Sequence, residues 1–417
     1  MTTGTESPIA LPRHSVPGVR RRLVTLVGPA FVAAVAYIDP GNFATNFESG
    51  ARFGYLLLWV VVLANIVAML LQYLSAKLGV ATGRSLPELC RETYRRPVVL
   101  GLWVQAEIVV IMTDVAELVG GAVALHLLFG LPMLTGGLMI AIGSFAVLSV
   151  RAAGQRGFEA LIAGALAVVA AVFLYQTLTA GVDVGQAAGG LVPRLDGASS
   201  LMLAVGVVGA TVMPHAVYLH SALTRERFAP GHGLGRKRLL RAQRMDVLVA
   251  MGVAGVINAA MLIAASGTLY GSGAEPTLAG AHAELAVTAG TSAATLFAVA
   301  LLASGLASSS VGIRAGEIVM EGFLRRRIPL YTRRLAAIVP ALVILGIGLD
   351  PTRALVLSQV VLSFGIPFAL IPLVLLTRRK DLMGPWVNRR LTTAVAGCVA
   401  LVVTALNAIL VTQVFSG

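Results

Sequence analysis

The sequence predicts an all-α polytopic membrane protein with about 11 transmembrane helices. Three observations indicate this fold class: 57% of the 417 residues are hydrophobic, only 12% are charged, and the apolar residues fall into long runs. A soluble domain carries roughly 25% charged residues, so this chain has about half the usual supply of charge. The composition therefore argues against a globular, a fibrous or a disordered protein.

Each apolar run can cross a bilayer as a helix, because a hydrocarbon core of roughly 30 Å needs about 20 residues. The predicted spans are 23–46, 54–76, 98–128, 132–150, 159–181, 200–223, 246–270, 290–320, 335–349, 354–377 and 391–415. The segments between them are too short for a separate soluble domain. Cys90 and Cys398 fall on opposite sides or at different depths, so we expect neither a disulfide nor a zinc site.

The distribution of positive charge predicts the orientation of the chain. With the N-terminus in the cytoplasm, 28 of the 32 Lys and Arg residues fall in the N-terminal tail and the inner loops, and Arg314 lies within a span. Inner loops of membrane proteins carry such an excess. We therefore expect a multi-pass membrane protein with a cytoplasmic N-terminus and an external C-terminus. The net charge of +13 then reflects topology, and no nucleic-acid partner is expected.

The first span contains a sequence that breaks helices. In Asp39-Pro40-Gly41-Asn42, the proline lacks a backbone donor and disfavours helix at the residue before it. We expect the helix to break at Asp39. A carboxylate within the membrane has a high free-energy cost. An intramembrane aspartate is therefore by default a functional residue with a partner.

The sixth span breaks in the same way at Met213-Pro214-His215. Five spans separate the two breaks, so the broken helices run in opposite directions. This pattern predicts two inverted five-helix repeats, which are typical of secondary transporters with a site near the bilayer midplane. The predicted parts are a basic cytoplasmic tail (1–22), a first repeat (23–182), a second repeat (197–377), and a cytoplasmic loop with the eleventh helix (378–417).

The residues at the breaks favour a transition metal as the transported ion. Asp39 and Asn42 offer oxygen, the unwound backbone offers carbonyls, and Met213 offers a soft thioether. Sulfur combined with oxygen suits Mn, Fe, Co or Cd better than Mg or Ca. Most intramembrane methionines only fill core space, and the adjacent Pro214 and His215 are the reason to favour a ligand here.

The third span carries three carboxylates in an otherwise apolar helix. Glu107, Asp114 and Glu117 lie on one side of it at 100° per residue, and this side should face the bundle interior. Acidic chains of this kind mark proton or ion pathways, with Arg333 and Arg334 as candidate counter-cations. The alternative is an ion-pair network that only holds helices together.

Other intramembrane polar residues give weaker signals. Gln72, Gln105 and Asn258 can bridge helices by hydrogen bonds, and Gln359 can also reach an ion at the midplane. The sequence contains no HExxH, P-loop or GxSxG motif. An enzyme and an ATP-driven pump are therefore disfavoured, and no cofactor is expected.

The two break motifs together resemble the signature of the natural resistance-associated macrophage protein (Nramp) family of divalent metal transporters. The likeness extends through 51–55, 106–117 and 316–323, so it covers nearly the whole chain. The resemblance implies a LeuT-like fold that carries Mn(II) or Fe(II), and also Cd(II) or Co(II), inward together with protons. Family members are often manganese importers of the bacterial plasma membrane.

The resemblance also implies residues for each ion. The implied metal ligands are Asp39, Asn42 and Met213, carbonyls of Ala36 or Ala210, and in some states Gln359. The implied proton route runs from Asp39 through Asp114 and Glu117 towards Arg333 and Arg334, with support from Glu107 and His215. The expected partners are divalent metal ions, protons and the lipid bilayer, and a monomer suffices.

Three residues depart from the family pattern. Arg314 and Glu317 stand where the family usually has an uncharged residue and a glutamine, and Ala216 stands where asparagine is frequent. Because Arg314 and Glu317 are three residues apart on one helix, we expect them to pair.

Two other functions stay open at this point. A sodium-coupled amino-acid carrier would share the fold, although Asp39 would repel a substrate carboxylate, which normally meets positive helix ends. A membrane protein that binds metal without transport would share the ligands.

Overall fold

The computed structural model of the chain describes residues 28–153, 155–228, 235–326 and 329–416, of which 146–153, 155–162, 330–331, 333–334 and 414–416 are described by their backbone alone. Every element within these ranges is a helix. Seven described stretches are long and apolar enough to cross a membrane. Three shorter apolar helices accompany them: Met133–Phe145, Ala163–Thr179 and Leu335–Gly346. Together these stretches overlap every predicted span, the first of them only at residues 40–46, and the all-helical fold class is confirmed.

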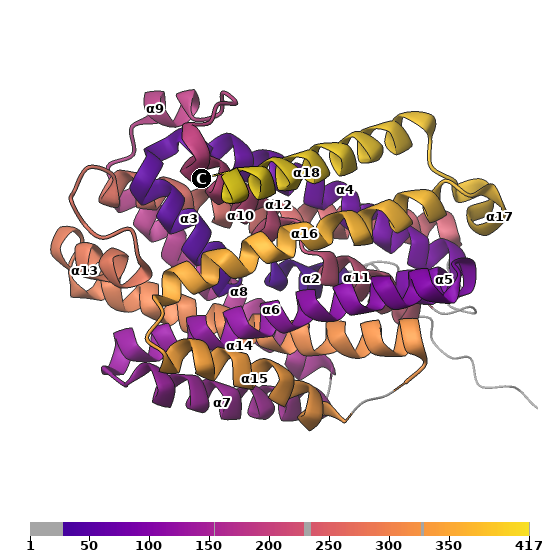
Figure 1. The fold of residues 1–417 in the computed structure, drawn as a ribbon, viewed down its shortest axis with the longest axis horizontal. Coiled ribbons are helices and arrows are strands. Elements are labelled where there is room, and N and C mark those ends of the chain that lie inside the picture. Colours follow the sequence, from indigo (N-terminus) through magenta and orange to yellow (C-terminus); the bar gives the residue numbers. More distant parts are fainter. Residues whose placement is uncertain (1–27, 154, 229–234, 327–328, 417) are drawn as a thin grey trace, which may run out of the picture.

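The long helices run mostly along the longest axis of the molecule (Figure 1). The first half contains α2 (Pro29–Ala36), α3 (Pro40–Phe53), η1 (Gly54–Leu57), α4 (Leu58–Thr82), α5 (Leu86–Thr93), α6 (Arg96–Phe129), α7 (Met133–Ala153) and α8 (Gln155–Thr179). The second half contains α10 (Gly197–Thr211), α11 (Pro214–Arg227), α12 (Arg236–Leu269), α14 (Thr291–Leu324), α15 (Leu330–Gly346), α16 (Pro351–Thr377) and the additional α18 (Arg390–Ser416).

Short helices connect the long ones at both ends of the bundle. The connecting helices α9 (Val184–Gly189) and α13 (Leu278–Thr288) lie at one end, and α5 and α17 (Lys380–Met383), which is followed by η2 (Gly384–Trp386), lie at the other (Figure 1). Basic residues flank both helices at the second end, with Arg84, Arg91, Arg95 and Arg96 around α5 and Arg378, Arg379, Lys380, Arg389 and Arg390 around α17, whereas segments 181–196 and 271–290 around α9 and α13 contain Arg194 as their only Lys or Arg residue. The bundle therefore has one end rich in basic residues and one end poor in them.

The seventh span is longer than predicted, because α12 begins at Arg236 rather than near residue 246. Leu239 and Leu240 in the added turns are buried and pack with Val80 and Phe228. These apolar contacts, together with the good helix propensity of Arg, Lys and Leu, extend the helix beyond the apolar run. The hydropathy of the span alone did not reveal this extension.

Both predicted helix breaks are present. The first break separates α2 from α3 and leaves Tyr37–Asp39 outside the helices, with Asp39 in an extended conformation before Pro40. The second separates α10 from α11, with Met213 in an extended conformation before Pro214. These are the conformations that a residue before proline prefers.

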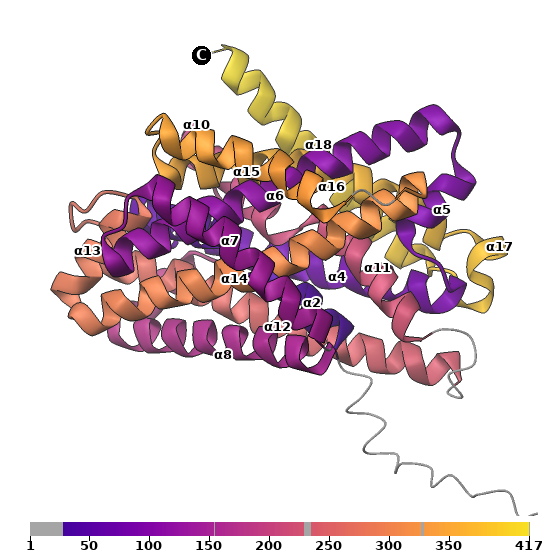
Figure 2. The ribbon, with the colours of Figure 1, turned by 90° about the horizontal axis from the view of Figure 1, so that it is seen from below.

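The broken helices lie among the longer ones (Figure 2). The half-helix α2 packs against α12 and α14, and α11 packs against α4, α14 and α16. A glycine allows α10 and α16 to approach closely. A Cβ at Gly209 of α10 would lie 1.9 Å from the backbone oxygen of Gln359 on α16. This contact places α16 directly beside the second break.

Candidate metal site

The two breaks meet at a buried cluster that contains the predicted metal ligands. Asp39, Asn42, Ala210 and Met213 are all fully buried. The backbone nitrogen and the Nδ2 atom of Asn42 both donate to Oδ1 of Asp39, at 2.8 Å each. Nδ2 of Asn42 also donates to the carbonyl oxygen of Ala210 at 2.9 Å. Asn42 therefore joins the first break to the second.

Four oxygen atoms in this region are buried and have no hydrogen-bond partner. They are Oδ2 of Asp39, Oδ1 of Asn42, Oγ1 of Thr211 and Oε1 of Gln359. Buried polar atoms are nearly always paired, so each exception requires an explanation. Three of the four belong to carboxylate or amide groups, which can only accept through oxygen. A bound cation is the partner that such a set lacks.

Proline explains why backbone carbonyls are available at both breaks. In a helix, the carbonyls of Ala36 and Ala210 would accept from the residues four positions later. Those residues are Pro40 and Pro214, which have no N–H group. Each break thus offers a carbonyl that has lost its helical donor. The two alanines that the family resemblance implies as ligands stand at these positions.

Gln359 reaches the site from α16. A Cβ on Gly41 would lie 1.9 Å from Nε2 of Gln359, so the amide of Gln359 occupies the space beside Gly41. The same nitrogen donates to Oγ of Ser358 at 3.0 Å. Gly41 therefore allows the side chain of Gln359 to approach α3 closely, in addition to its part in the first helix break.

A second hydrogen-bond network holds the unwound segment in place. Nε2 of Gln72 donates to the hydroxyl of Tyr37 at 2.5 Å, and Oε1 of Gln72 lies 2.7 Å from Nδ1 of His220. Nδ2 of Asn258 donates to the carbonyl of Tyr37 at 3.0 Å, and the hydroxyl of Ser304 donates to the carbonyl of Ile38. These contacts confirm that Gln72 and Asn258 bridge helices.

The predicted carboxylates of the third span lie on α6, near the breaks. Asp114 and Glu117 are buried, and Glu107 is half-buried two turns away. A Cβ at Gly312 of α14 would lie 3.1 Å from Oδ1 of Asp114 and 3.3 Å from Oε1 of Glu117. The missing side chain at Gly312 thus makes room for both carboxylates.

α6 also contacts both breaks. A Cβ at Gly120 of α6 would lie 2.1 Å from Cβ of Pro40, and Oγ1 of Thr113 lies 3.4 Å from Nδ1 of His215. His215 follows the second break directly and is buried. The carboxylates therefore lie within one or two turns of residues that touch each break.

The remaining predicted residues have different outcomes. The side chains of Arg333 and Arg334 lie outside the described residues, so their predicted role stays a prediction. Arg314 pairs with Glu317 at 2.9 Å, as expected, and additionally with Glu226 of α11 at 2.6 Å.

Sequence reasoning missed two features of the site. Thr211 was not identified as a candidate, although it ends α10 two residues before Met213. The contact between Gln359 and Gly41 was also not foreseen. The sequence did offer one indication for Thr211. It lies between the helix break and Ala210, whose carbonyl lacks a helical donor because residue 214 is proline.

These observations define a multi-pass membrane protein, helical in the part of the chain that the structure describes, whose two broken helices meet at a buried group of oxygen atoms and carry the buried Met213. Residues 30–413 match the family model described as natural resistance-associated macrophage protein-like. The chain therefore belongs to the Nramp family, whose curated members are named as transporters, and it is not an enzyme.

The relatives extend over nearly the whole chain. It is 49% identical over 397 residues to the Bacillus subtilis divalent metal cation transporter MntH, covering 95% of this chain and 93% of the relative. It is 52% identical over 394 residues to the protein of the same name from Mycobacterium tuberculosis H37Rv, covering 94% and 92%.

Solved structures agree with the fold. A mutant of the Eremococcus coleocola manganese transporter superposes with a TM-score of 0.85 at 30% identity, over 97% of this chain and 89% of that chain. The nucleobase-cation-symport-1 family transporter Mhp1 superposes with a TM-score of 0.61 at 17% identity, over 92% and 90%. The latter is a likeness of fold alone.

Proposed function

We propose that this protein imports divalent transition-metal ions, with Mn(II) and Fe(II) as the principal substrates, across the plasma membrane together with protons. The observation that carries the proposal is the group of buried oxygen atoms without partners around Asp39, Asn42 and Met213. The names of the relatives from Bacillus subtilis and Mycobacterium tuberculosis support a divalent metal substrate.

We infer that the amide nitrogen of Asn42 engages acceptors that the metal would bind. It contacts Oδ1 of Asp39 and the carbonyl of Ala210, which are both acceptors that a cation would bind. A rotation of the amide by half a turn would direct Oδ1 of Asn42 towards the same centre. The ligand set would then comprise Asp39, Asn42, Met213 and the carbonyls of Ala36 or Ala210, with Gln359 in some states.

Coupling to protons is proposed from the position of the α6 carboxylates. Asp39 is expected to release its proton when the metal binds, because the positive ion favours the carboxylate form. Asp114 and Glu117 would receive the proton and pass it towards Arg333 and Arg334. His215 and Glu107 would assist, and the contact between Thr113 and His215 supports the connection between α6 and the second break.

The positive-inside count supports a cytoplasmic N-terminus and an external C-terminus. With this orientation the metal would enter from the end at which α9 and α13 lie and leave at the end of α5 and α17. A monomer without a cofactor is sufficient, because every implied ligand comes from one chain.

The test is Mn(II) uptake into proteoliposomes at two external pH values, for the unmodified chain and for Asp39→Ala. We expect uptake to increase when the outside is more acidic than the inside, and to fall to the background of protein-free vesicles in Asp39→Ala. Binding of Mn(II) by calorimetry without any flux would instead indicate a metal-binding protein. Uptake of labelled amino acids in a sodium gradient would indicate the other carrier of this fold.

A further inference from the structure

We propose that the elbow between α5 and α6 binds one anionic glycerophospholipid. Its phosphate would lie among Arg91, Arg96 and Arg326, and one acyl chain would lie in the groove between α6, α16 and α18. This site lies apart from the metal site, and the proposed import function does not require it. The proposal depends on two hollows that share Tyr94.

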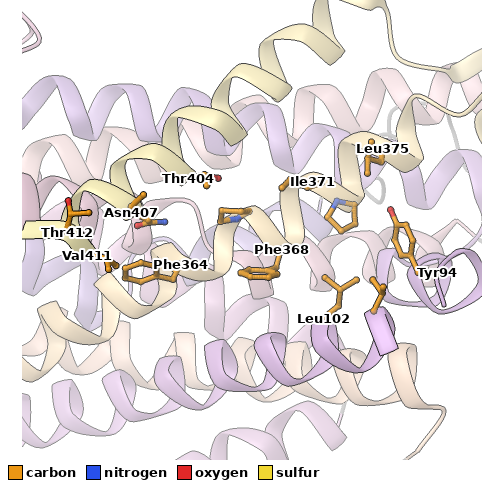
Figure 3. Close-up of a pocket in the computed structure, with 14 residues that line it drawn as sticks. Tyr94, Leu102, Phe364, Phe368, Ile371, Leu375, Thr404, Asn407, Val411 and Thr412 are labelled. Carbon is orange, nitrogen blue, oxygen red and sulfur yellow. The ribbon is translucent and has the colours of Figure 1, made fainter. Parts of the chain in front are cut away.

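The first hollow is an apolar groove of about 800 Å³ that opens on the side of the bundle. Phe364, Phe368 and Ile371 of α16 face Leu102 of α6 and Val411 of α18 across it, and Tyr94 stands at one end (Figure 3). Phe368 is 48% exposed. Because this side of a membrane helix faces hydrocarbon, a lipid acyl chain is the natural occupant.

The second hollow, of about 710 Å³, is basic at its rim and apolar at its wall. The charged side chains that line it, among the described residues, are Arg91, Arg96 and Arg326. Leu100 and Trp103 of α6 form part of its apolar wall. A positive rim above an apolar wall matches a negatively charged lipid headgroup above its chains.

Two residues that line this hollow each carry a buried hydrogen-bond donor without an acceptor. Arg91 uses one terminal nitrogen to donate to the carbonyls of Glu321 and Gly322 at the end of α14. Its Nε atom is buried without a partner, and so is Nε1 of Trp103. Phosphate and ester oxygens are acceptors, so a phospholipid headgroup supplies the kind of atom that both donors lack.

The surroundings of the elbow favour a negative ligand. Burial and then the charge of Arg325 lower the pKa of Arg91 from its ordinary value, and Glu88 opposes this effect. Glu88 is itself engaged by Arg225 and by the backbone of Ser85. A phosphate would offset the repulsion among the arginines, whereas a zwitterionic headgroup would leave part of it uncompensated.

One lipid can reach both hollows, because they lie on neighbouring faces of the first turns of α6. Val98 and Leu102 line the groove, and Val99 and Trp103, each one position later, line the basic hollow. A lipid headgroup at Tyr94 would therefore be adjacent to both hollows. With the proposed orientation this elbow faces the inner leaflet, where anionic lipids attract basic residues near a membrane surface.

Trp103 provides a direct readout. In a Trp59→Phe, Trp386→Phe background it is the only tryptophan of the three in the chain. The protein is reconstituted in vesicles that contain phosphatidylglycerol or phosphatidylcholine with brominated acyl chains, at matched mole fractions. We expect brominated phosphatidylglycerol to quench Trp103 at several-fold lower mole fraction. Equal quenching by the two lipids would overturn the proposal.

Charge variants test the headgroup contact. Arg96→Gln and Arg326→Gln leave the Arg91 contacts to α14 intact and should weaken the preference for phosphatidylglycerol by about fivefold each. The control replaces Arg236, Lys237 and Arg238, which lie at the start of α12 at the same end of the bundle, with Gln and should leave the preference unchanged. A loss of preference in the control would indicate a general effect of charge, which contradicts a defined site.

Two further experiments test whether inorganic phosphate or a second copy of the chain occupies the site instead of a lipid. Millimolar inorganic phosphate should not abolish the preference, because the acyl chain contributes to binding; its abolition would identify a phosphate site without a lipid. Light scattering should give a monomer in detergent with and without phosphatidylglycerol. A dimer that excludes the brominated lipid from Trp103 would show that a second copy covers the groove, and the proposal would fail.

Discussion

At the scale of single residues, Asn42 links the two helix breaks, because its amide nitrogen donates to Asp39 and to the carbonyl of Ala210. Asp39 and Met213 directly precede prolines in apolar spans, which made them conspicuous in the sequence, and both are fully buried. Thr211 and the contact of Gln359 with Gly41 could not be predicted, because they depend on how α10, α16 and α3 approach one another. A hydroxyl near a helix end is too common to indicate a ligand.

Met213→Ala tests the contribution of sulfur to selectivity. We expect the variant to bind and transport Mn(II) and Cd(II) about tenfold less well relative to Mg(II) and Ca(II), because the hard ions do not require a thioether. The measurement is uptake of each ion in competition with Mn(II) in proteoliposomes. Met213→Leu is the control for volume and should show the same loss; an unchanged selectivity in both would mean that Met213 only fills space.

At the scale of helices, the spans and both breaks were predictable from hydropathy and from the Pro-Gly and Pro-His motifs. The early start of α12 was not, because it depends on tertiary contacts such as those of Leu239 and Leu240. The short helices α5, α9 and α13 were also not predicted, although each has a local capping residue at its start, Ser85, Asp183 and Thr277 respectively. The packing of α10 against α16 could not be predicted either. The residues around a glycine such as Gly209 do not show which helix it contacts.

Gly209→Ala tests the close approach of α10 and α16. Its Cβ would meet the backbone oxygen of Gln359 at 1.9 Å, so one helix must shift, at a cost of about 1–3 kcal/mol. We expect Gly209→Ala to lower the midpoint of thermal unfolding relative to the unmodified chain. We expect it to reduce Mn(II) uptake by a larger factor than this loss of stability alone would. Gly397→Ala on α18 is the matched control, because nothing lies within 4 Å of its Cβ; it should be neutral or stabilising.

Glu88→Gln tests the attachment of α5 to α11. Burial raises the pKa of Glu88, but hydrogen bonds from Ser85 and Arg225 and the charge of Arg225 outweigh it, so that the net pKa is below the ordinary value. The ionised form therefore stabilises the folded chain above the unfolded pKa of about 4.3, and this stabilisation is lost as pH falls through the lower folded pKa.

The measurement is the unfolding midpoint between pH 7 and pH 3 for both chains. The unmodified chain should lose more stability on acidification than Glu88→Gln, whose side chain does not titrate. Parallel pH profiles would contradict a stabilising role for this ion pair.

At the scale of the whole molecule, the basic and non-basic ends of the bundle were predictable from loop charge, and the structure places α5 and α17 at one end and α9 and α13 at the other (Figure 1). The lateral groove was not predictable, because three helices far apart in the sequence form it. Which membrane leaflet each end faces follows from the charge rule and requires a direct test.

Accessibility to a membrane-impermeant thiol reagent tests the orientation. In a background with Cys90→Ala and Cys398→Ala, a cysteine at Ser272, between α12 and α13, should be labelled in intact cells. A cysteine at Arg238, at the start of α12, should be labelled only after the cells are opened. Both positions are exposed in the structure, so the reverse pattern would mean that the chain is inserted the other way round.

The spacing of each proline from the alanine four residues before it has a consequence for how the site can evolve. Because Pro40 and Pro214 withhold an N–H from the carbonyls of Ala36 and Ala210, these carbonyls would remain available to a cation whatever side chain stands at the alanine. Replacing either proline would supply a donor that competes with the ion for the same oxygen. In the proposed site, affinity for metal would thus depend partly on two prolines that do not themselves bind the metal.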